Sequence, residues 1–146
     1  MTDFSQFEQF EQSVDARLYR FDMLEINGKV PVVYFRPATS ANPDFYGESL
    51  KRVAARQKSG AKVGEVDMAR VNLTRDEDRE LFANFCAVKW EDVDGSDGKA
   101  SKFSKENCHK FLKAVPDWAF DQLRAWIITP QNFVKGMAAD GTTLGN

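Results

Sequence analysis

This chain of 146 residues has few histidines and cysteines, and its net charge is not positive. It contains one histidine, His109, and two cysteines, Cys86 and Cys108. These side chains are too few for a disulfide framework, and they cannot complete a tetrahedral zinc site unassisted. Both cysteines lie inside apolar segments, so we expect reduced thiols. The formal net charge of -2 gives no overall attraction to nucleic acid or to an anionic membrane.

Long apolar runs are also absent, and none approaches the roughly 20 residues of a membrane span. The first residues, MTDF, lack the basic and apolar regions of an export signal, so we expect a cytoplasmic protein. Phenylalanine, by contrast, is abundant, with 12 residues against 3 Trp and 3 Tyr. A composition of 42% hydrophobic and 29% charged residues is typical of one globular domain. Its core should rest on rings that need no polar partner.

Catalytic motifs are missing: there is no P-loop, dinucleotide fingerprint, nucleophile elbow or HExxH. Cys108 and His109 are adjacent, but neighbouring helical residues point about 100° apart, so they cannot face one another as a catalytic pair. The acidic turn 92–97 fits no EF-hand frame, because Asp97 stands where glycine belongs and Phe103 where the last acid belongs. We therefore expect a non-enzyme without a cofactor or metal, with Cys108 buried and the turn solvated.

A β-hairpin is predicted from two segments with a period of two residues, RLYRFDML and KVPVVYF, joined across Asn27-Gly28. A four-residue loop, 26–29, is preferred, because a two-residue turn would require an N–H from Pro31. The facing pairs are then Met23 with Val32 and Phe21 with Tyr34. Two strands alone are not stable, so the hairpin must pack on helices or pair with another chain.

Four later segments show the apolar period of a helix and carry start or stop signals. They begin at Asn42-Pro43, at the capping box Thr74–Glu77, at Ser104 and at Pro116-Asp117, and the first, second and fourth end near Ser59-Gly60, before Trp90 and at Thr129-Pro130. Their apolar faces are, in chain order, Tyr46, Leu50, Val53 and Ala54; Leu81, Phe82, Phe85 and Cys86; Cys108, Phe111, Leu112 and Val115; and Phe120, Leu123, Trp126 and Ile127. Residues 61–72 show no clear period and are assigned as loop or short strand.

These elements predict a helix-dominated α+β fold of about four amphipathic helices packed with an N-terminal hairpin. The predicted division is a Phe-rich arm or helix at 1–16, a single globular domain at 17–135 and a flexible C-terminal tail at 136–146. Self-association through the edge strand of the hairpin is a further expectation.

The opening stretch FSQFEQFEQS, residues 4–13, places phenylalanine at every third position. On an α-helix, Phe4, Phe7, Phe10 and Val14 fall within an arc of about 120°. So short a terminal helix needs a surface to fold against. Two interpretations stay open: that surface is the chain's own core, or it belongs to a partner protein. On the second interpretation these four residues form a partner-binding site.

From Thr74 to Phe133 the order of features resembles the tail assembly chaperones of long-tailed bacteriophages. A charged helix leads to VKWEDV, an Asp-Gly turn, FSKEN, a Pro-Asp break and a last helix. The matching positions are Val88, Trp90, Val93, Asp97, Gly98, Phe103, Ser104, Glu106, Asn107, Leu112, Pro116, Asp117 and Phe133. The Phe-rich opening is not part of this pattern.

The resemblance implies a non-catalytic protein that binds the tape measure protein, keeps it soluble and helps recruit tail tube subunits. It also implies the cytoplasm of the infected bacterial host as the location, and absence from the mature virion. One alternative is a structural tail or head-to-tail component retained in the virion. A second is a small phage nucleic-acid-binding protein that uses the basic helix face of Lys51, Arg52, Arg56 and Lys58, beside Lys62. A solvated helix surface is the simpler interpretation of that face.

Overall fold

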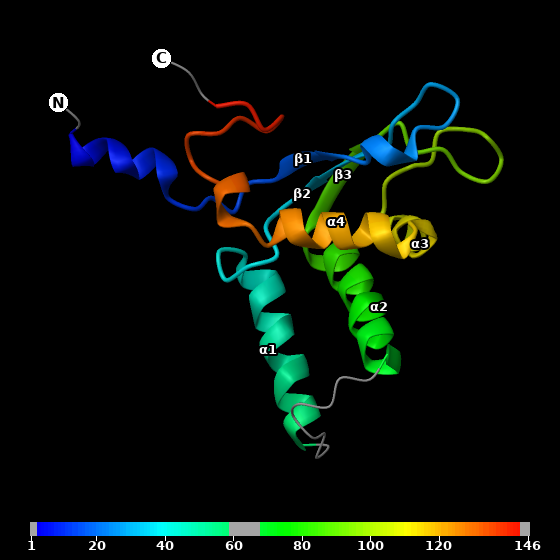
Figure 1. Cartoon of the computed structure of the whole chain (residues 1–146), viewed down its shortest axis with the longest axis horizontal. Coiled ribbons are helices and arrows are strands. Elements are labelled where there is room, and N and C mark those ends of the chain that lie inside the picture. The colour runs from blue at the N-terminus through cyan, green and yellow to red at the C-terminus, as the bar shows by residue number, and fades with distance from the viewer. Residues whose placement is uncertain (1–2, 59–67, 144–146) are drawn as a thin grey trace.

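The computed structural model describes residues 3–58 and 68–143. Four α-helices and a three-stranded sheet follow a short N-terminal 3-10 helix (Figure 1). The α-helices are α1 (Pro43–Lys58), α2 (Met68–Phe85), α3 (Lys105–Ala114) and α4 (Asp117–Ile127), and the strands are β1 (Arg17–Arg20), β2 (Val32–Phe35) and β3 (Ala87–Glu91). The 3-10 helices are η1 (Phe4–Phe10), η2 (Asp22–Leu24) and η3 (Pro130–Asn132). The predicted helix-dominated α+β fold is confirmed.

The sheet is antiparallel with strand order β1-β2-β3, so β2 is its centre. The third strand was not predicted. Its burial does not alternate strictly: Ala87 is buried while Val88 and Lys89 are both exposed, because the register with β2 shifts between Tyr34 and Phe35. The strand closely follows the end of α2. By pairing with β2 it supplies the partner that a two-stranded hairpin needs for stability.

The predicted hairpin register is wrong. Arg20 rather than Met23 pairs with Val32, and Met23 is exposed. The cause is η2, which ends β1 early through a hydrogen bond from the Leu24 N–H to the Phe21 carbonyl. The Pro31 carbonyl then accepts a hydrogen bond from the Phe21 N–H. Pro31 is not required to donate one, so its missing N–H removes no hydrogen bond between the strands.

The prediction of a four-residue loop, 26–29, is also wrong. Ile26 and Lys29 exchange two backbone hydrogen bonds, of 2.9 and 3.0 Å, around the two-residue turn Asn27-Gly28. Both turn residues have positive φ, 54° and 77°, as a type I′ turn requires. The turn is tolerated because this bridge is isolated from the ladder that contains Pro31.

The core is aromatic, as predicted. Phe35, Phe82, Phe120 and Phe133 are almost fully buried, and α4 crosses one face of the sheet (Figure 1). Ring contacts join the sheet, and Phe21 just after β1, to α3 and α4, with centroid separations of 5.0 Å for Tyr19–Trp126, 5.3 Å for Phe21–Phe111 and 5.9 Å for Trp90–Phe111. The predicted ends of α3 and α4 are confirmed, including Ser104 as N-cap through its hydrogen bond from the Asn107 N–H.

Helix α2 begins at Met68, so the predicted capping box at Thr74 is wrong. Thr74 lies inside the helix, and the charges around it form ion pairs with other helices instead. Arg75 contacts Asp121 of α4 at 2.9 Å, and Glu80 contacts Arg52 of α1 at 3.0 Å. The segment 61–72, predicted as loop or short strand, is helical from Met68 on, so this part of the prediction is wrong. The rest of the segment, with Lys62, and the predicted stop at Ser59-Gly60 lie outside the described residues.

Helix α1 packs differently from the amphipathic helix that the sequence predicts. Two contacts hold its N-terminus on α2. The buried Asn42 side chain donates a hydrogen bond to the Phe85 carbonyl at 2.9 Å, and the Phe45 ring packs on the Phe82 ring. The predicted apolar stripe of Tyr46, Leu50 and Val53 is exposed. In Figure 1, α1 and α2 extend side by side away from the sheet.

Candidate partner-binding surface

The three phenylalanines of the N-terminal arm, residues 3–14, are exposed. These residues are 80% (Phe4), 57% (Phe7) and 63% (Phe10) exposed. The arm forms a 3-10 helix rather than the α-helix assumed from the sequence, and its three residues per turn align these rings in one row. Val14, 37% exposed, lies beyond the end of the helix. The Phe row therefore faces solvent and not the core of this chain.

The arm is held by the C-terminal segment 133–137, as an added antiparallel strand would be (Figure 1). Three backbone hydrogen bonds join them: Ser13 N–H to Phe133 O at 2.7 Å, Lys135 N–H to Glu11 O at 3.0 Å and Gly136 N–H to Gln9 O at 2.8 Å. The Lys135 ammonium also contacts the Glu11 carboxylate at 2.8 Å, which raises the pKa of Lys135. The arm is thus fixed along one side while its rings stay free for contact.

Arg17 anchors the base of the arm. Its side chain is buried, and Nη2 donates to the Val134 carbonyl at 3.0 Å while Nη1 donates to the Ala16 carbonyl at 3.2 Å. Nearby, the Leu18 N–H donates to the Ala139 carbonyl at 2.8 Å, so the C-terminal segment also contacts the outer edge of β1. Residues up to Thr143 of the predicted tail lie in this ordered arrangement, and the flexibility expected for 136–146 stays a prediction.

A groove of about 530 Å³ lies between the arm and the C-terminal segment. Its surface is mostly apolar, and its lining consists of Gln9, Phe10, Gln12, Pro130, Gln131, Val134, Gly136, Met137 and Thr143. Because Phe10 belongs both to the row and to this lining, the two form one continuous surface. A groove of this size accommodates several apolar side chains of a protein partner.

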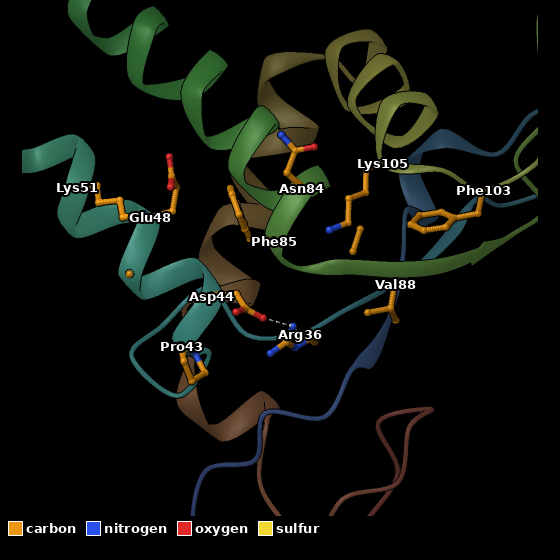
Figure 2. Close-up of a pocket in the computed structure, with 12 residues that line it drawn as sticks. Arg36, Pro43, Asp44, Glu48, Lys51, Asn84, Phe85, Val88, Phe103 and Lys105 are labelled. Carbon is orange, nitrogen blue, oxygen red and sulfur yellow. Dashed lines mark hydrogen bonds and ion pairs between the residues drawn. The ribbon is translucent and has the colours of Figure 1, made fainter. Parts of the chain in front are cut away.

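A second groove, of about 750 Å³, lies between α1, the end of α2 and β3 (Figure 2). Its lining is mixed: Asp44 pairs with Arg36 at 3.1 Å across its floor, and Glu48, Lys51 and Lys105 add charges around it. Neither His109 nor a cysteine is among the residues that line it. None of the partner-binding residues predicted from the sequence lies in this groove.

The two cysteines are buried, as expected for Cys108. Burial raises the pKa of the Cys108 thiol to about 12 and also raises that of Cys86, so both thiols stay protonated. Burial, followed by the charge of Lys113, lowers the pKa of His109. Within residues 3–58 and 68–143, no three of the His, Cys, Asp and Glu side chains gather as metal ligands would.

Two cations of the basic face of α1, Arg52 and Arg56, are paired with acids. Arg52 contacts Glu48, Glu77 and Glu80 at 3.2, 3.7 and 3.0 Å, and Arg56 is bonded to Glu77. The positive charge of these two arginines is therefore neutralised within the chain, which leaves less of it for a phosphate backbone.

A family model described as "YdaY prophage protein" matches residues 44–138, which is 95 of the 146 residues. The chain belongs to the YdaY prophage protein family. No curated protein and no solved structure matches it. The phage origin implied by the resemblance from Thr74 to Phe133 is thereby confirmed. The matched range includes α1 and the C-terminal segment that holds the arm, but it does not include the arm itself. No helix in the described part of this family member is long and apolar enough to cross a bilayer.

Sequence reasoning found the Phe row but missed the surface that holds it. The docking of residues 9–13 on 133–136 joins the two ends of the chain, and no local period predicts such a contact. One available signal was Gly136: a Cβ there would lie 3.0 Å from the Gln9 Cβ and 3.1 Å from the Gln9 carbonyl oxygen, so any other residue would require residue 9 to shift by a few tenths of an ångström.

Proposed function

We propose that this prophage protein is a non-catalytic tail assembly chaperone that binds the tape measure protein, keeps it soluble and helps recruit tail tube subunits. The partner-binding residues are Phe4, Phe7, Phe10 and Val14. The observation that carries the proposal is the exposed Phe row, because large exposed rings on a fixed arm are otherwise an aggregation hazard.

The geometry of the row suits a helical partner. In a 3-10 helix the rise is about 2 Å per residue, so successive Phe residues stand about 6 Å apart along the arm. One turn of an α-helix advances about 5.4 Å, so the three rings match apolar side chains on successive turns of an amphipathic helix. The groove beside Phe10 adds a pocket for one more turn. A helix-rich tape measure protein exposes such stripes before the tube covers it.

The role places the protein in the cytoplasm of the infected host during assembly and removes it before the virion is complete. A chaperone must release its client, and contacts made mostly by apolar rings in solvent have the modest affinity that release requires. A structural tail component would instead remain in purified particles, so mass spectrometry of those particles separates the two roles.

The test is co-expression with the product of the longest open reading frame just downstream, which we expect to be the tape measure protein. The wild-type chain should keep that product soluble and co-purify with it. A variant with Phe4, Phe7 and Phe10 changed to Ser should lose at least about 80% of the soluble product, because each ring removed forfeits roughly 1.5 to 3 kcal/mol of burial at most.

The matched control changes Met23 and Ile26, which are 66% and 69% exposed, to Ser. Circular dichroism should give the same helix content for both variants and the wild type. Solubilisation that survives the loss of all three rings, in a folded variant, contradicts the assignment of the arm. A client that is equally soluble with no chaperone present contradicts the function itself.

A further inference from the structure

The Phe row is one of three rows of side chains along the arm. From residue 4 to residue 12 the sequence repeats Phe, then Ser or Glu, then Gln, three times. Because the 3-10 helix η1 has three residues per turn, each position of this repeat falls on its own side of the arm. Besides the Phe row there are an acid row, which consists of Ser5, Glu8 and Glu11, and a Gln row, which consists of Gln6, Gln9 and Gln12.

The Gln row faces the C-terminal segment. The Gln9 Cβ lies 3.0 Å from the place that a Cβ of residue 136 would take, and Gln12 forms a β-bridge with Val134. Both glutamines also line the groove between the arm and this segment. The Phe row and the acid row are thus left side by side toward solvent, and every residue from 3 to 12 is exposed. A partner that packs on the Phe row therefore also meets the acid row.

The acid row is only partly neutralised. Residues 3–15 contain no lysine, arginine or histidine, and their acids are Asp3, Glu8, Glu11 and Asp15. The Lys135 ammonium lies 2.8 Å from the Glu11 carboxylate, and after Glu11 the charge of Glu8 also raises the pKa of Lys135, so both acids lie toward this lysine. Within the described residues, however, Glu8 takes part in no ion pair. The chain thus seats one ammonium on the acid row and leaves the carboxylate one turn earlier open.

We propose that the arm selects a client helix whose apolar stripe is flanked by lysine or arginine, and that Glu8 determines this selection. The inference rests on the proposed function and names the class of client segment. The Phe row packs on the stripe, but rings alone do not distinguish one apolar stripe from another. Adjacent residues of an α-helix point about 100° apart, so a basic residue next to the stripe reaches toward the row beside the Phe row. Its cation there meets Glu8 as Lys135 meets Glu11.

Charge also argues against other occupants of this surface. In a second copy of the chain the Phe row is flanked by the same acids, so packing of arm on arm would set like charges together. A nucleic acid or an anionic membrane is repelled for the same reason. A client stripe flanked by acids is repelled as well, whereas one flanked by cations is steered toward the arm. The sign of the flanking charge is therefore the property by which the arm discriminates between helices.

Three synthetic helical peptides test the selection. They share one leucine stripe and differ only in the residues that flank it, which are lysine, glutamine or glutamate. Fluorescence anisotropy measures their binding to the full chain. An exposed ion pair contributes up to about fivefold in affinity, so the lysine peptide should bind at least about threefold more tightly than the glutamine peptide, and the glutamate peptide should bind more weakly than either. These differences should shrink in about 0.5 M NaCl, which screens exposed charges.

Variants of the acid row locate the effect. Glu8→Gln should remove most of the preference for the lysine peptide, and Glu8→Lys should reverse it in favour of the glutamate peptide. Glu25→Lys is the matched control, because it changes the net charge equally at an exposed acid that follows η2, outside the arm. Lys135→Met should strengthen binding of the lysine peptide about twofold, because it frees the Glu11 carboxylate. Circular dichroism should be the same for all four variants and the wild type.

The outcomes separate this inference from the proposed function. A preference for the lysine peptide that is lost with Glu8→Lys and kept with Glu25→Lys supports the inference. Equal binding of the three peptides, binding of none, or a preference that survives Glu8→Lys overturns it. The proposed function then still stands if solubility of the co-expressed client depends on the three phenylalanines. A client that is equally soluble without this chain contradicts the proposed function, whereas the peptides report on the arm alone.

Discussion

Arg79 is the buried charge on which three helices converge. From α2, its Nε donates to the Leu112 carbonyl at 2.8 Å, and its Nη2 donates to the Val115 carbonyl at 3.0 Å and to Asp117 at 2.9 Å. Its guanidinium also lies 4.6 Å from the centroid of the Phe120 ring. One side chain thus satisfies carbonyls at the end of α3 and an acid at the start of α4.

Arg79→Lys should destabilise the fold by about 2 to 3 kcal/mol, because an ammonium cannot reproduce the planar fork and leaves at least one buried carbonyl unpaired. Urea unfolding at pH 7 measures this loss. Arg124→Lys is the control, since Arg124 is partly exposed and, among the residues that the structure describes, its side chain bonds to the carboxylates of Asp78 and Asp121 rather than to carbonyls. Equal losses for the two variants would mean that the carbonyls contribute nothing.

At the scale of elements, docking of the arm depends on the absence of a side chain at position 136. Gly136→Val should push residues 9–13 away, because the new Cβ would crowd the Gln9 carbonyl oxygen. Hydrogen exchange at Ser13 and Lys135, whose N–H groups cross this interface, should accelerate at least about tenfold.

The same substitution should lower the global free energy of unfolding by less than about 1 kcal/mol, because the arm buries none of its residues in the core. Unchanged exchange at Ser13 would show that the arm is held by Arg17 alone.

Elements with a local cause were predictable from the sequence. Ser104 and Pro116 bound α3 and α4 through capping and a missing N–H, which depend on a few neighbouring residues. The register of β1 on β2 was not, since it depends on η2, a single turn without a strong signal. The start of α2 was predicted at the wrong residue because the pattern Thr74 to Glu77 has two possible causes. It is typical of a helix cap, and it is equally typical of a charged helix face that contacts neighbouring helices, here α1 and α4.

The candidate site was also predictable only where its cause is local. The period of Phe4, Phe7 and Phe10 is local, so the row was visible in the sequence. Whether the row is buried depends on contacts across the whole chain, which is why two interpretations stayed open. The apolar face of α1 was likewise visible in the sequence. The period of a helix shows which residues share a face, but it does not show whether another element covers that face, and here Tyr46, Leu50 and Val53 are exposed.

At the scale of the whole molecule, α1, α2 and α4 are joined by ion pairs. The hydrogen bond from Arg52 lowers the pKa of Glu80, and that from Arg75 lowers the pKa of Asp121. A carboxyl whose pKa is lower in the folded state stabilises the fold above its unfolded pKa of about 4, and this contribution is lost as the pH falls through the folded pKa. Burial raises the pKa of Asp78, which acts in the opposite direction.

We therefore expect the urea midpoint to change little from pH 7 to 5 and to fall below pH 4. Both acids are more than a third exposed, so solvent screening keeps each contribution under about 1 kcal/mol. Arg75→Met should reduce the fall between pH 4 and 3, because Asp121 then loses the partner that lowers its pKa. A fall of the same size in both proteins contradicts the assignment.

Because segments 9–13 and 133–137 lie against one another, a reporter or affinity tag attached near either one would crowd the same groove. Experiments that place labels at the two ends would then report on the same surface and could mistake steric blockage for loss of binding. The Asn27-Gly28 turn lies away from both segments (Figure 1) and has an exposed tip. It is the position at which an inserted epitope would leave the arm unhindered.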